Sequence, residues 1–213
     1  MQRRLVLKQM AALGGLALVG SRALAQGAPY TVLPTPQPTE AKGKVEVIEF
    51  FSYGCPHCHD FDPLLTGWVK NLPKDVNFLR VPITFNRPEW AAYGRIYYAL
   101  EAMGELDRLH PEVFKALHES HIPIHEEAAL LDWAASKGVD RKKLAETLRS
   151  YGVLQARMPR ALQVAAAYKV TGVPLLAVDG KWMISASGAK GFDNMLKVAD
   201  ELILKARKEQ GRS

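Results

Sequence analysis

The segment Val45-Glu-Val-Ile-Glu-Phe-Phe-Ser-Tyr-Gly-Cys-Pro-His-Cys58 is the most informative part of this 213-residue chain. Residues 45–52 are rich in β-branched and aromatic side chains, which is typical of a buried strand. They run directly into Cys55 and Cys58, and after Pro56 the pattern becomes helical as far as about Lys70. The sequence therefore predicts two closely spaced cysteines at the point where a buried strand passes into a helix.

Cys55 and Cys58 are the only cysteines in the chain, and a pair so close in sequence cannot join distant segments. Their value must therefore lie in chemistry. Unpaired N–H groups and the helix dipole favour negative charge at a helix start, so we expect a low pKa at Cys55 and a thiolate near neutral pH. Cys58, one turn further on, should be more buried and should resolve mixed disulfides formed at Cys55.

The dipeptide Pro56-His57 between the cysteines tunes the direction of exchange. His57 can supply a positive charge or a hydrogen bond to Cys55, and whatever stabilises the thiolate makes the disulfide a stronger oxidant. On this argument the pair donates disulfides rather than reducing them. The alternative is that His57 is simply an exposed side chain at a helix end.

The first 25 residues have the features of a cleaved export signal, which predicts a periplasmic protein. Basic residues precede an apolar run over 10–20 and a small-residue stop at Ala25. A transmembrane anchor is the alternative, but this run is far shorter than the about 20 apolar residues that a spanning helix needs. Arg3-Arg4 resembles a twin-arginine signal, with the general secretory route as the alternative. Removing the four basic residues of the signal lowers the formal charge from +6 to +2, which gives no reason to expect nucleic-acid binding.

The remainder divides into strand-containing parts and a helical block. Residues 26–44 hold four prolines and suit an extended N-terminal segment with a short strand at 30–33. Another strand is expected at 76–83. Residues 86–152 have no strand pattern, and Asn86 with Glu89 resembles a capping box for the first helix. The helices predicted in this block cover residues 86–103, 112–119, 126–137 and 141–150.

After the block we expect a helix at 155–170 that Pro159 starts or kinks, and a final helix at 192–208. Between them, Asp179-Gly180 predicts a hairpin that joins strands 175–179 and 182–185. The aromatic residues Trp90, Tyr93 and Tyr97 recur at helical spacing, which predicts core packing rather than a ligand cage.

Two motifs resemble those of the DsbA family of thiol-disulfide oxidases. Residues Glu49 to Cys58 are similar to the family's active-site segment, and Gly172-Val173-Pro174 is similar to its cis-proline loop. The resemblance covers nearly all of the chain after the signal. It implies an α/β thioredoxin fold, formed by residues 45–85 and 153–208, with an all-helical subdomain inserted at 86–152.

The resemblance also implies functional roles. Cys55 would be the nucleophile and Cys58 its partner, while Val173 and Pro174 would form a cis peptide that faces the sulfurs and offers backbone groups to an extended substrate. The substrates would be reduced, newly exported proteins, and a DsbB-type quinone-linked membrane protein would reoxidise the disulfide. We expect no metal and no cofactor besides the disulfide itself, and a monomer is our default. A trans proline that begins a strand is the alternative at Pro174.

The family keeps an acidic residue at the position of Glu49, but Arg80 stands where the family commonly has lysine. Because arginine stays charged, we expect Arg80 to hold Glu49 ionised, and any proton relay to rest on the carboxylate and water. A plain cross-strand ion pair is the alternative.

Several other functions fit parts of the sequence. Cys55-x-x-Cys58-His59 is also the attachment signature of c-type haem, although a strand leading into the motif argues against it. On the oxidase interpretation His59 is an exposed residue of the first helical turn. Zinc is weaker, because the remaining histidines lie in the helical block. A disulfide isomerase or reductase of the same fold would also fit, as would a chaperone-like peptide-binding module.

Overall fold

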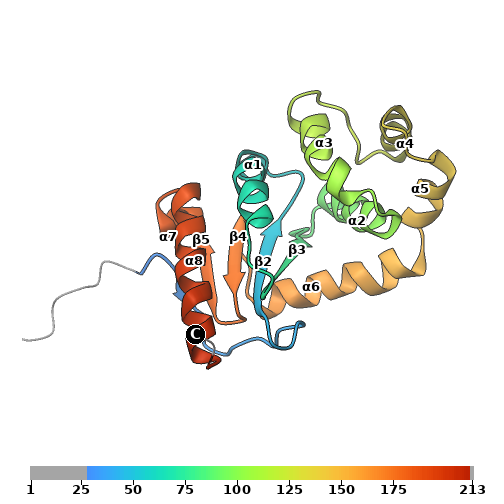
Figure 1. Ribbon diagram of the computed structural model, residues 1–213. Coiled ribbons are helices and arrows are strands. Elements are labelled where there is room, and N and C mark those ends of the chain that lie inside the picture. The colour runs from blue at the N-terminus through green and yellow to red at the C-terminus, as the bar shows by residue number, and fades with distance from the viewer. Residues whose placement is uncertain (1–27, 212–213) are drawn as a thin grey trace, which may run out of the picture.

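The computed structural model describes residues 28–211, and the predicted export signal lies outside these residues. A five-stranded sheet with the strand order β1-β5-β4-β2-β3 forms the centre of the molecule (Figure 1). Helices lie on both faces of this sheet and beyond the β3 edge. Within the described part of the chain, no helix is long and apolar enough to span a membrane.

The strands agree with the sequence predictions to within one residue at each end. Strand β2 pairs in parallel with β3 and antiparallel with β4, and β4–β5 and β5–β1 are antiparallel. All seven residues of β2 are buried, because helices cover the sheet on both sides. The strands are β1 (Thr31–Val32), β2 (Val45–Phe51), β3 (Val76–Pro82), β4 (Leu175–Val178) and β5 (Trp182–Ser185).

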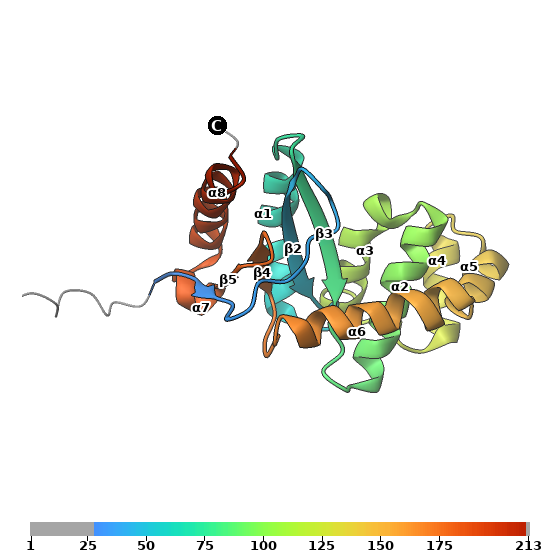
Figure 2. The ribbon, with the colours of Figure 1, turned by 90° about the horizontal axis from the view of Figure 1, so that it is seen from below.

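Helices cover both faces of the sheet (Figure 2), and each face has its own apolar core. Helices α1 (Pro56–Lys70) and α8 (Phe192–Glu209) pack on one face, where Val45 and Val47 of β2 point. Helix α6 (Met158–Ala167) packs on the opposite face. Alternation along β2 thus serves both cores, and its end delivers the chain to the start of α1.

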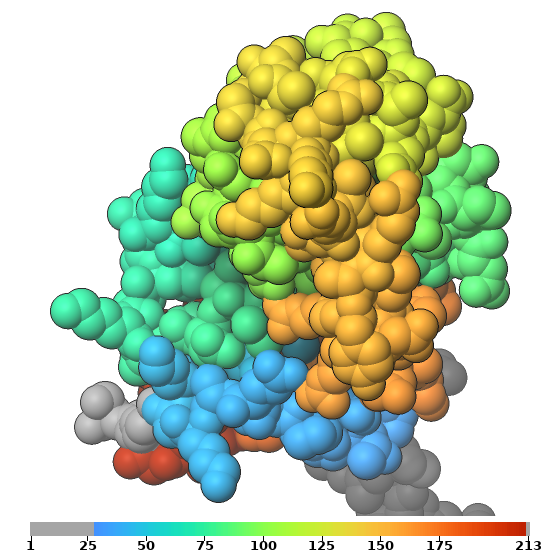
Figure 3. Space-filling view, turned by 90° about the vertical axis from the view of Figure 1, so that its right-hand side faces the viewer, coloured from blue at the N-terminus to red at the C-terminus, as the bar shows by residue number. Residues whose placement is uncertain are grey.

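The helical block lies beyond β3 and contacts the thioredoxin-like part mainly through its first two helices. Helix α3 packs against α1, and α2 packs against β3 and α6. Figure 3 shows the block and α6 forming one continuous face, with α6 running from the block toward the N-terminal segment. The helices of the block are α2 (Pro88–Met103), α3 (Leu106–His118), α4 (Glu127–Ser136) and α5 (Arg141–Leu148).

Three details of the helices differ from the predictions. The capping box at Asn86 is wrong: Arg87 is the N-cap, and Asn86 has φ +58° in a sharp turn, where its side chain is not placed to cap α2. Helix α3 begins six residues earlier than predicted and contains Pro111. The helix predicted from 155 begins as a π-helix, Gly152–Arg157, before α6, with Pro159 at the first turn of α6.

The predicted hairpin is confirmed between β4 and β5. Asp179 and Gly180 both have positive φ, +51° and +67°, and form the centre of a turn closed by the Lys181 N–H, which donates to the Val178 carbonyl oxygen. Val178 pairs with Trp182, so three residues connect the strands where the dipeptide predicted two. A short helix, α7 (Ala186–Ala189), follows β5 and was not predicted. The architecture confirms the expected α/β class, with a helical region between the strands of a thioredoxin-like sheet.

Candidate active site

The two cysteines lie at the junction of β2 and α1, as predicted. Cys55 is the N-cap residue of α1, and Pro56 occupies the first helical position, where its missing N–H costs nothing. Both thiols are free, and Cys58 is fully buried whereas Cys55 is 7% exposed. This order of burial confirms the expectation that Cys58 is the more buried of the two.

The two thiols titrate very differently. The pKa of Cys55 is lowered to about 6, chiefly because the Cys58 thiol donates a hydrogen bond to it; burial opposes this shift, and the N–H groups of Cys58 and His57 add to it. Burial and the neighbouring Cys55 thiolate raise the pKa of Cys58 far above the ordinary value. The low pKa of Cys55 is therefore confirmed, but the partner thiol contributes more than the helix start that we expected to dominate.

His57 lines the groove of the site and is largely exposed. Its side chain is 76% exposed, and its Nδ1 atom is 3.9 Å from Asp60 Oδ2. The positive charge of His57 is the smallest of the named contributions that lower the pKa of Cys55. Stabilisation of the Cys55 thiolate by His57 remains a prediction, and its expected effect on the pKa of Cys55 is small.

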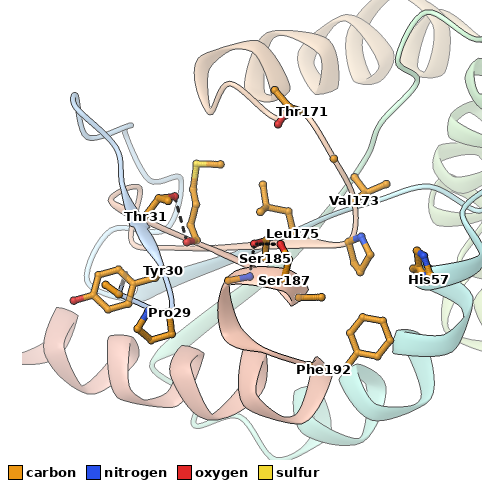
Figure 4. A pocket seen from close by; sticks show the side chains of 17 residues that line it. Pro29, Tyr30, Thr31, His57, Thr171, Val173, Leu175, Ser185, Ser187 and Phe192 are labelled. Atoms are coloured by element: carbon orange, nitrogen blue, oxygen red, sulfur yellow. Dashed lines mark hydrogen bonds between the residues drawn. The ribbon is translucent and has the colours of Figure 1, made fainter. Parts of the chain in front are cut away.

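The loop before β4 closes the other side of the site. The Val173–Pro174 peptide bond is cis, and the Cys55 thiol lies 3.5 Å from the carbonyl oxygen of Val173 and is oriented to donate to it. Beside this loop runs a groove of about 720 Å³. In Figure 4 its wall includes Val173, His57 and Phe192, and small side chains of the β5–α7 connection form the floor.

Beneath the cysteines, Glu49 of β2 and Arg80 of β3 are register neighbours in the parallel pair. Arg80 Nε donates to Glu49 Oε2 over 2.8 Å, and Glu49 is 1% exposed. Burial raises the pKa of Glu49 to about 7, and Arg80 only partly offsets this effect. The expectation that Arg80 keeps Glu49 firmly ionised is therefore wrong, because desolvation of the carboxylate outweighs the ion pair.

Two further buried groups extend this pair, and the sequence analysis missed both. Asp62 of α1 lies 3.6 Å from Arg80 and 3.1 Å from Nε2 of His110, which belongs to α3. Burial disfavours the Asp62 carboxylate, but His110, Arg80 and Thr66 together hold its pKa below the usual range. Burial lowers the pKa of His110, so this histidine is neutral at neutral pH. One sequence signal could have identified both residues. Asp62 and His110 each lie three or four positions from apolar residues of the same helix, so each falls on the helix face that packs into the core.

The assignment of His59 as an exposed residue is also wrong. Its side chain is 22% exposed and its ring stacks on His118 of α3, with the ring centroids 5.0 Å apart. Of the aromatic residues at helical spacing, Tyr93 and Tyr97 are buried in the core, as predicted.

The haem and zinc alternatives find no support in this geometry. Cys58 belongs to the first turn of α1 and is fully buried, so its sulfur is not exposed to a haem at the surface. Among residues 28–211, no group of three or more histidine, cysteine, aspartate or glutamate side chains is arranged to hold a metal.

Comparison with known proteins agrees with the geometry. Residues 46–200 match the model of the DSBA-like thioredoxin domain family. A thiol:disulfide interchange protein DsbA of Pseudomonas aeruginosa is 38% identical over 207 residues, which covers 96% of this chain and 97% of that protein. The protein of the same name from Bordetella pertussis is 40% identical over 200 residues, covering 93% and 94%.

Solved structures show the same likeness. The crystal structure of Pseudomonas aeruginosa DsbA superposes with a TM-score of 0.83 at 39% identity and covers 87% of this chain and 96% of that one. The oxidoreductase NmDsbA1 of N. meningitidis gives a TM-score of 0.76 at 28% identity, with 87% and 95% covered. With the paired cysteines, the cis-proline loop and the match over residues 46–200 taken together, the chain belongs to the DSBA-like thioredoxin domain family.

Proposed function

We propose that this protein is a thiol-disulfide oxidase that donates its Cys55–Cys58 disulfide to reduced, newly exported proteins in the periplasm. The observation that carries the proposal is the unequal pair of thiols: the pKa of Cys55 is lowered to about 6, and that of Cys58 is strongly raised. A sulfur that is stable as a thiolate is a good leaving group, so a disulfide ending in it is a strong oxidant.

The exchange takes two steps. A client thiolate attacks Cys55 Sγ, the Cys55–Cys58 bond breaks, and Cys58 leaves as a thiolate that takes up a proton. A second client thiolate then attacks the client sulfur of the mixed disulfide and releases Cys55 as its stable thiolate. The client loses two electrons and gains a disulfide, and the cysteine pair gains those two electrons.

Glu49 is the buried group that we assign to proton exchange with Cys58. The two are coupled, because the Glu49 carboxylate contributes to the raised pKa of Cys58. With a pKa of about 7, Glu49 can give up or accept a proton at neutral pH. Arg80 pairs with Glu49 and keeps this pKa from rising further.

Val173 and the groove supply the binding surface. An extended client segment can pair with the backbone of Val173, next to Cys55 Sγ, while its apolar side chains enter the groove. Such a site would recognise backbone groups and apolar side chains rather than a particular sequence, so it could bind many different unfolded proteins. We further propose reoxidation by a DsbB-type quinone-linked membrane protein at the same surface.

One redox titration tests the direction of the reaction. The purified protein is equilibrated with reduced and oxidised glutathione, and the oxidised fraction is read after acid quenching and alkylation. We expect a potential well above the value of about −270 mV typical of thioredoxin, together with oxidation of a reduced secreted protein at one disulfide per protein molecule. A potential at or below that value would make the protein a reductase and overturn the proposal.

Two controls test the competing functions. Exchange of a scrambled substrate without net oxidation would indicate an isomerase. Protection of an unfolded client by the Cys55→Ser variant, undiminished from the wild type, would indicate a peptide-binding module in which the thiols are incidental.

A further inference from the structure

Several side chains of the helical block contact the active-site turn, and one of them is a histidine that has no part in the exchange proposed above. His118, the last residue of α3, places Nε2 2.7 Å from the backbone carbonyl oxygen of Tyr53, two residues before Cys55. A carbonyl oxygen only accepts hydrogen bonds, so Nε2 of His118 carries the hydrogen and donates it.

The same imidazole contacts the chain on the other side of the two cysteines. Its ring stacks on His59, one residue after Cys58, with an interplanar angle of 21°. Phe114, one turn earlier on α3, lies near both rings, with centroids 5.9 Å from His59 and 6.2 Å from His118. One side chain of the block therefore touches both segments that flank Cys55-Pro56-His57-Cys58.

We propose that His118 is a positioning residue for the reactive thiol: its hydrogen bond to Tyr53 and its stack on His59 hold the active-site turn in the reactive geometry. The inference rests on the proposed thiol-disulfide exchange and adds a residue outside the thioredoxin-like sheet to the machinery that tunes it.

The Tyr53–Gly54 peptide needs such a partner because the sheet no longer holds it. Pairing of β2 with β3 ends at Phe51, two residues earlier. The N–H of Gly54 donates to Ser52 Oγ over 3.2 Å, and the carbonyl of the same peptide unit accepts from His118. The peptide plane that leads into Cys55 is thus held at both of its polar atoms.

Packing restricts the same turn from the side. A β-carbon on Gly54 would lie 2.7 Å from Nε1 of Trp90, so the chain passes close against α2. The Tyr53 hydroxyl is 2.7 Å from Nδ1 of His110, so two histidines of α3, His110 and His118, make polar contacts with Tyr53. The difference between the two contacts matters for testing, because His110 is buried in the core whereas His118 is partly exposed and can be replaced at smaller cost.

Holding this turn in place affects the reactivity of the Cys55 sulfur. The thiolate depends on hydrogen bonds from the Cys58 thiol and from the N–H groups of His57 and Cys58, and these act only while Cys55 keeps its place at the start of α1. Freeing the preceding peptide lets the turn sample other positions and weakens this set. Loss of His118 should therefore alter the reactivity of a sulfur that it does not touch.

Three substitutions of His118 separate the hydrogen bond from the stack. His118→Gln keeps an amide N–H near the position of Nε2 and loses the ring, His118→Phe keeps a ring and loses the donor, and His118→Ala loses both. His125, a partly exposed histidine of the same block, supplies the matched controls His125→Gln and His125→Phe.

The readouts are the pKa of Cys55, followed by thiolate absorbance against pH, and the redox potential against glutathione; thermal unfolding reports stability separately. One lost hydrogen bond should slow alkylation at pH 6 about three- to tenfold in His118→Phe, and His118→Ala, which also loses the stack, should be slowed at least as much. His118→Gln should stay within about twofold of the wild type, as should both His125 controls.

Unchanged Cys55 pKa and potential in His118→Phe, or equal shifts in His118→Gln and His118→Phe, would overturn the proposal. Should His118→Phe fail to fold, Ser52→Ala releases the other end of the same peptide and must raise the pKa of Cys55 for the proposal to stand. A wild-type protein with a reducing potential would instead overturn the oxidase assignment, while the comparison among His118 variants would still decide this inference.

Discussion

Cys55 Sγ lies 3.5 Å from the carbonyl oxygen of Val173, so the reactive sulfur faces a backbone segment 118 residues further along the chain. In the function proposed above, a client segment that pairs with Val173 would therefore lie beside the sulfur that is less buried than Cys58 and more stable as an anion. Cys58 is fully buried and forms a hydrogen bond with Cys55. This arrangement leads to predictions about Cys55 and about three ionisable residues near the two cysteines, His57, Glu49 and Arg80.

The reduced protein should be alkylated at Cys55 with a midpoint near pH 6, because the Cys58 thiol and two backbone N–H groups stabilise the thiolate. Mass spectrometry after a brief pulse of iodoacetamide at each pH should find the label on Cys55 and none on Cys58. The denatured protein is the control and should titrate near the ordinary value of about 8.5. A native midpoint near that value would contradict the assigned role of Cys55.

The same shift predicts how stability changes with pH in the reduced protein. A lowered thiol pKa adds stability that is fully present above the unfolded-state value of about 8.5 and is lost as the pH falls to about 6. The Cys55→Ser variant should lack this dependence. Urea unfolding under reducing conditions at pH 6 and pH 9 measures it, and an equal pH dependence in both proteins would count against a stabilised thiolate.

His57→Ala should raise the pKa of Cys55 by less than about one unit, because the exposed His57 makes the smallest of the named contributions. The redox potential should fall in parallel, by less than about 30 mV. Thiolate absorbance and glutathione equilibration give the two values. A larger drop in potential would mean that His57 acts on the thiolate from closer than its side-chain position in the structure.

Glu49→Gln should change the pH dependence of folding in the neutral range. A carboxyl whose pKa is raised from 4.5 to about 7 contributes stability in its protonated form, and that contribution is lost as the pH rises through this interval. The free energy of unfolding of the wild type relative to Glu49→Gln should therefore fall by up to about 3 kcal/mol between pH 4.5 and pH 7.5. Denaturation of the oxidised proteins removes the thiols from the comparison, and a constant difference would contradict the raised pKa.

Arg80→Met should be among the most destabilising substitutions in the protein, by about 3–5 kcal/mol at pH 8. It leaves the buried carboxylates of Glu49 and Asp62 without their shared cation. The loss should be smaller at pH 5, where Glu49 is protonated. Arg80→Lys keeps the charge and should fall between Arg80→Met and the wild type; equal stabilities for all three proteins would refute a structural role for the ion pairs.

Local sequence pattern was enough to predict most elements and the chemistry of the cysteine pair. The strand at 45–51, the helix start at Pro56 and the Asp179-Gly180 hairpin depend on the side chains of neighbouring residues, which are visible in the chain itself. The relation between Cys55 and Cys58 is likewise local, because three residues and a helix start place both sulfurs. The Val173–Pro174 peptide was placed by its likeness to the family loop.

Only the tertiary structure shows which residues surround Cys55 and Cys58. His110 joins Asp62, and His118 joins Tyr53, only because α3 packs against α1, and no spacing within the helical block reveals that contact. The same packing explains why His59, which the sequence predicted to be exposed, stacks on His118. Glu49 shows the energetic side of this limit: Arg80 could be named as its partner from the sequence, but the ionisation of Glu49 depends on how completely the fold removes water from it.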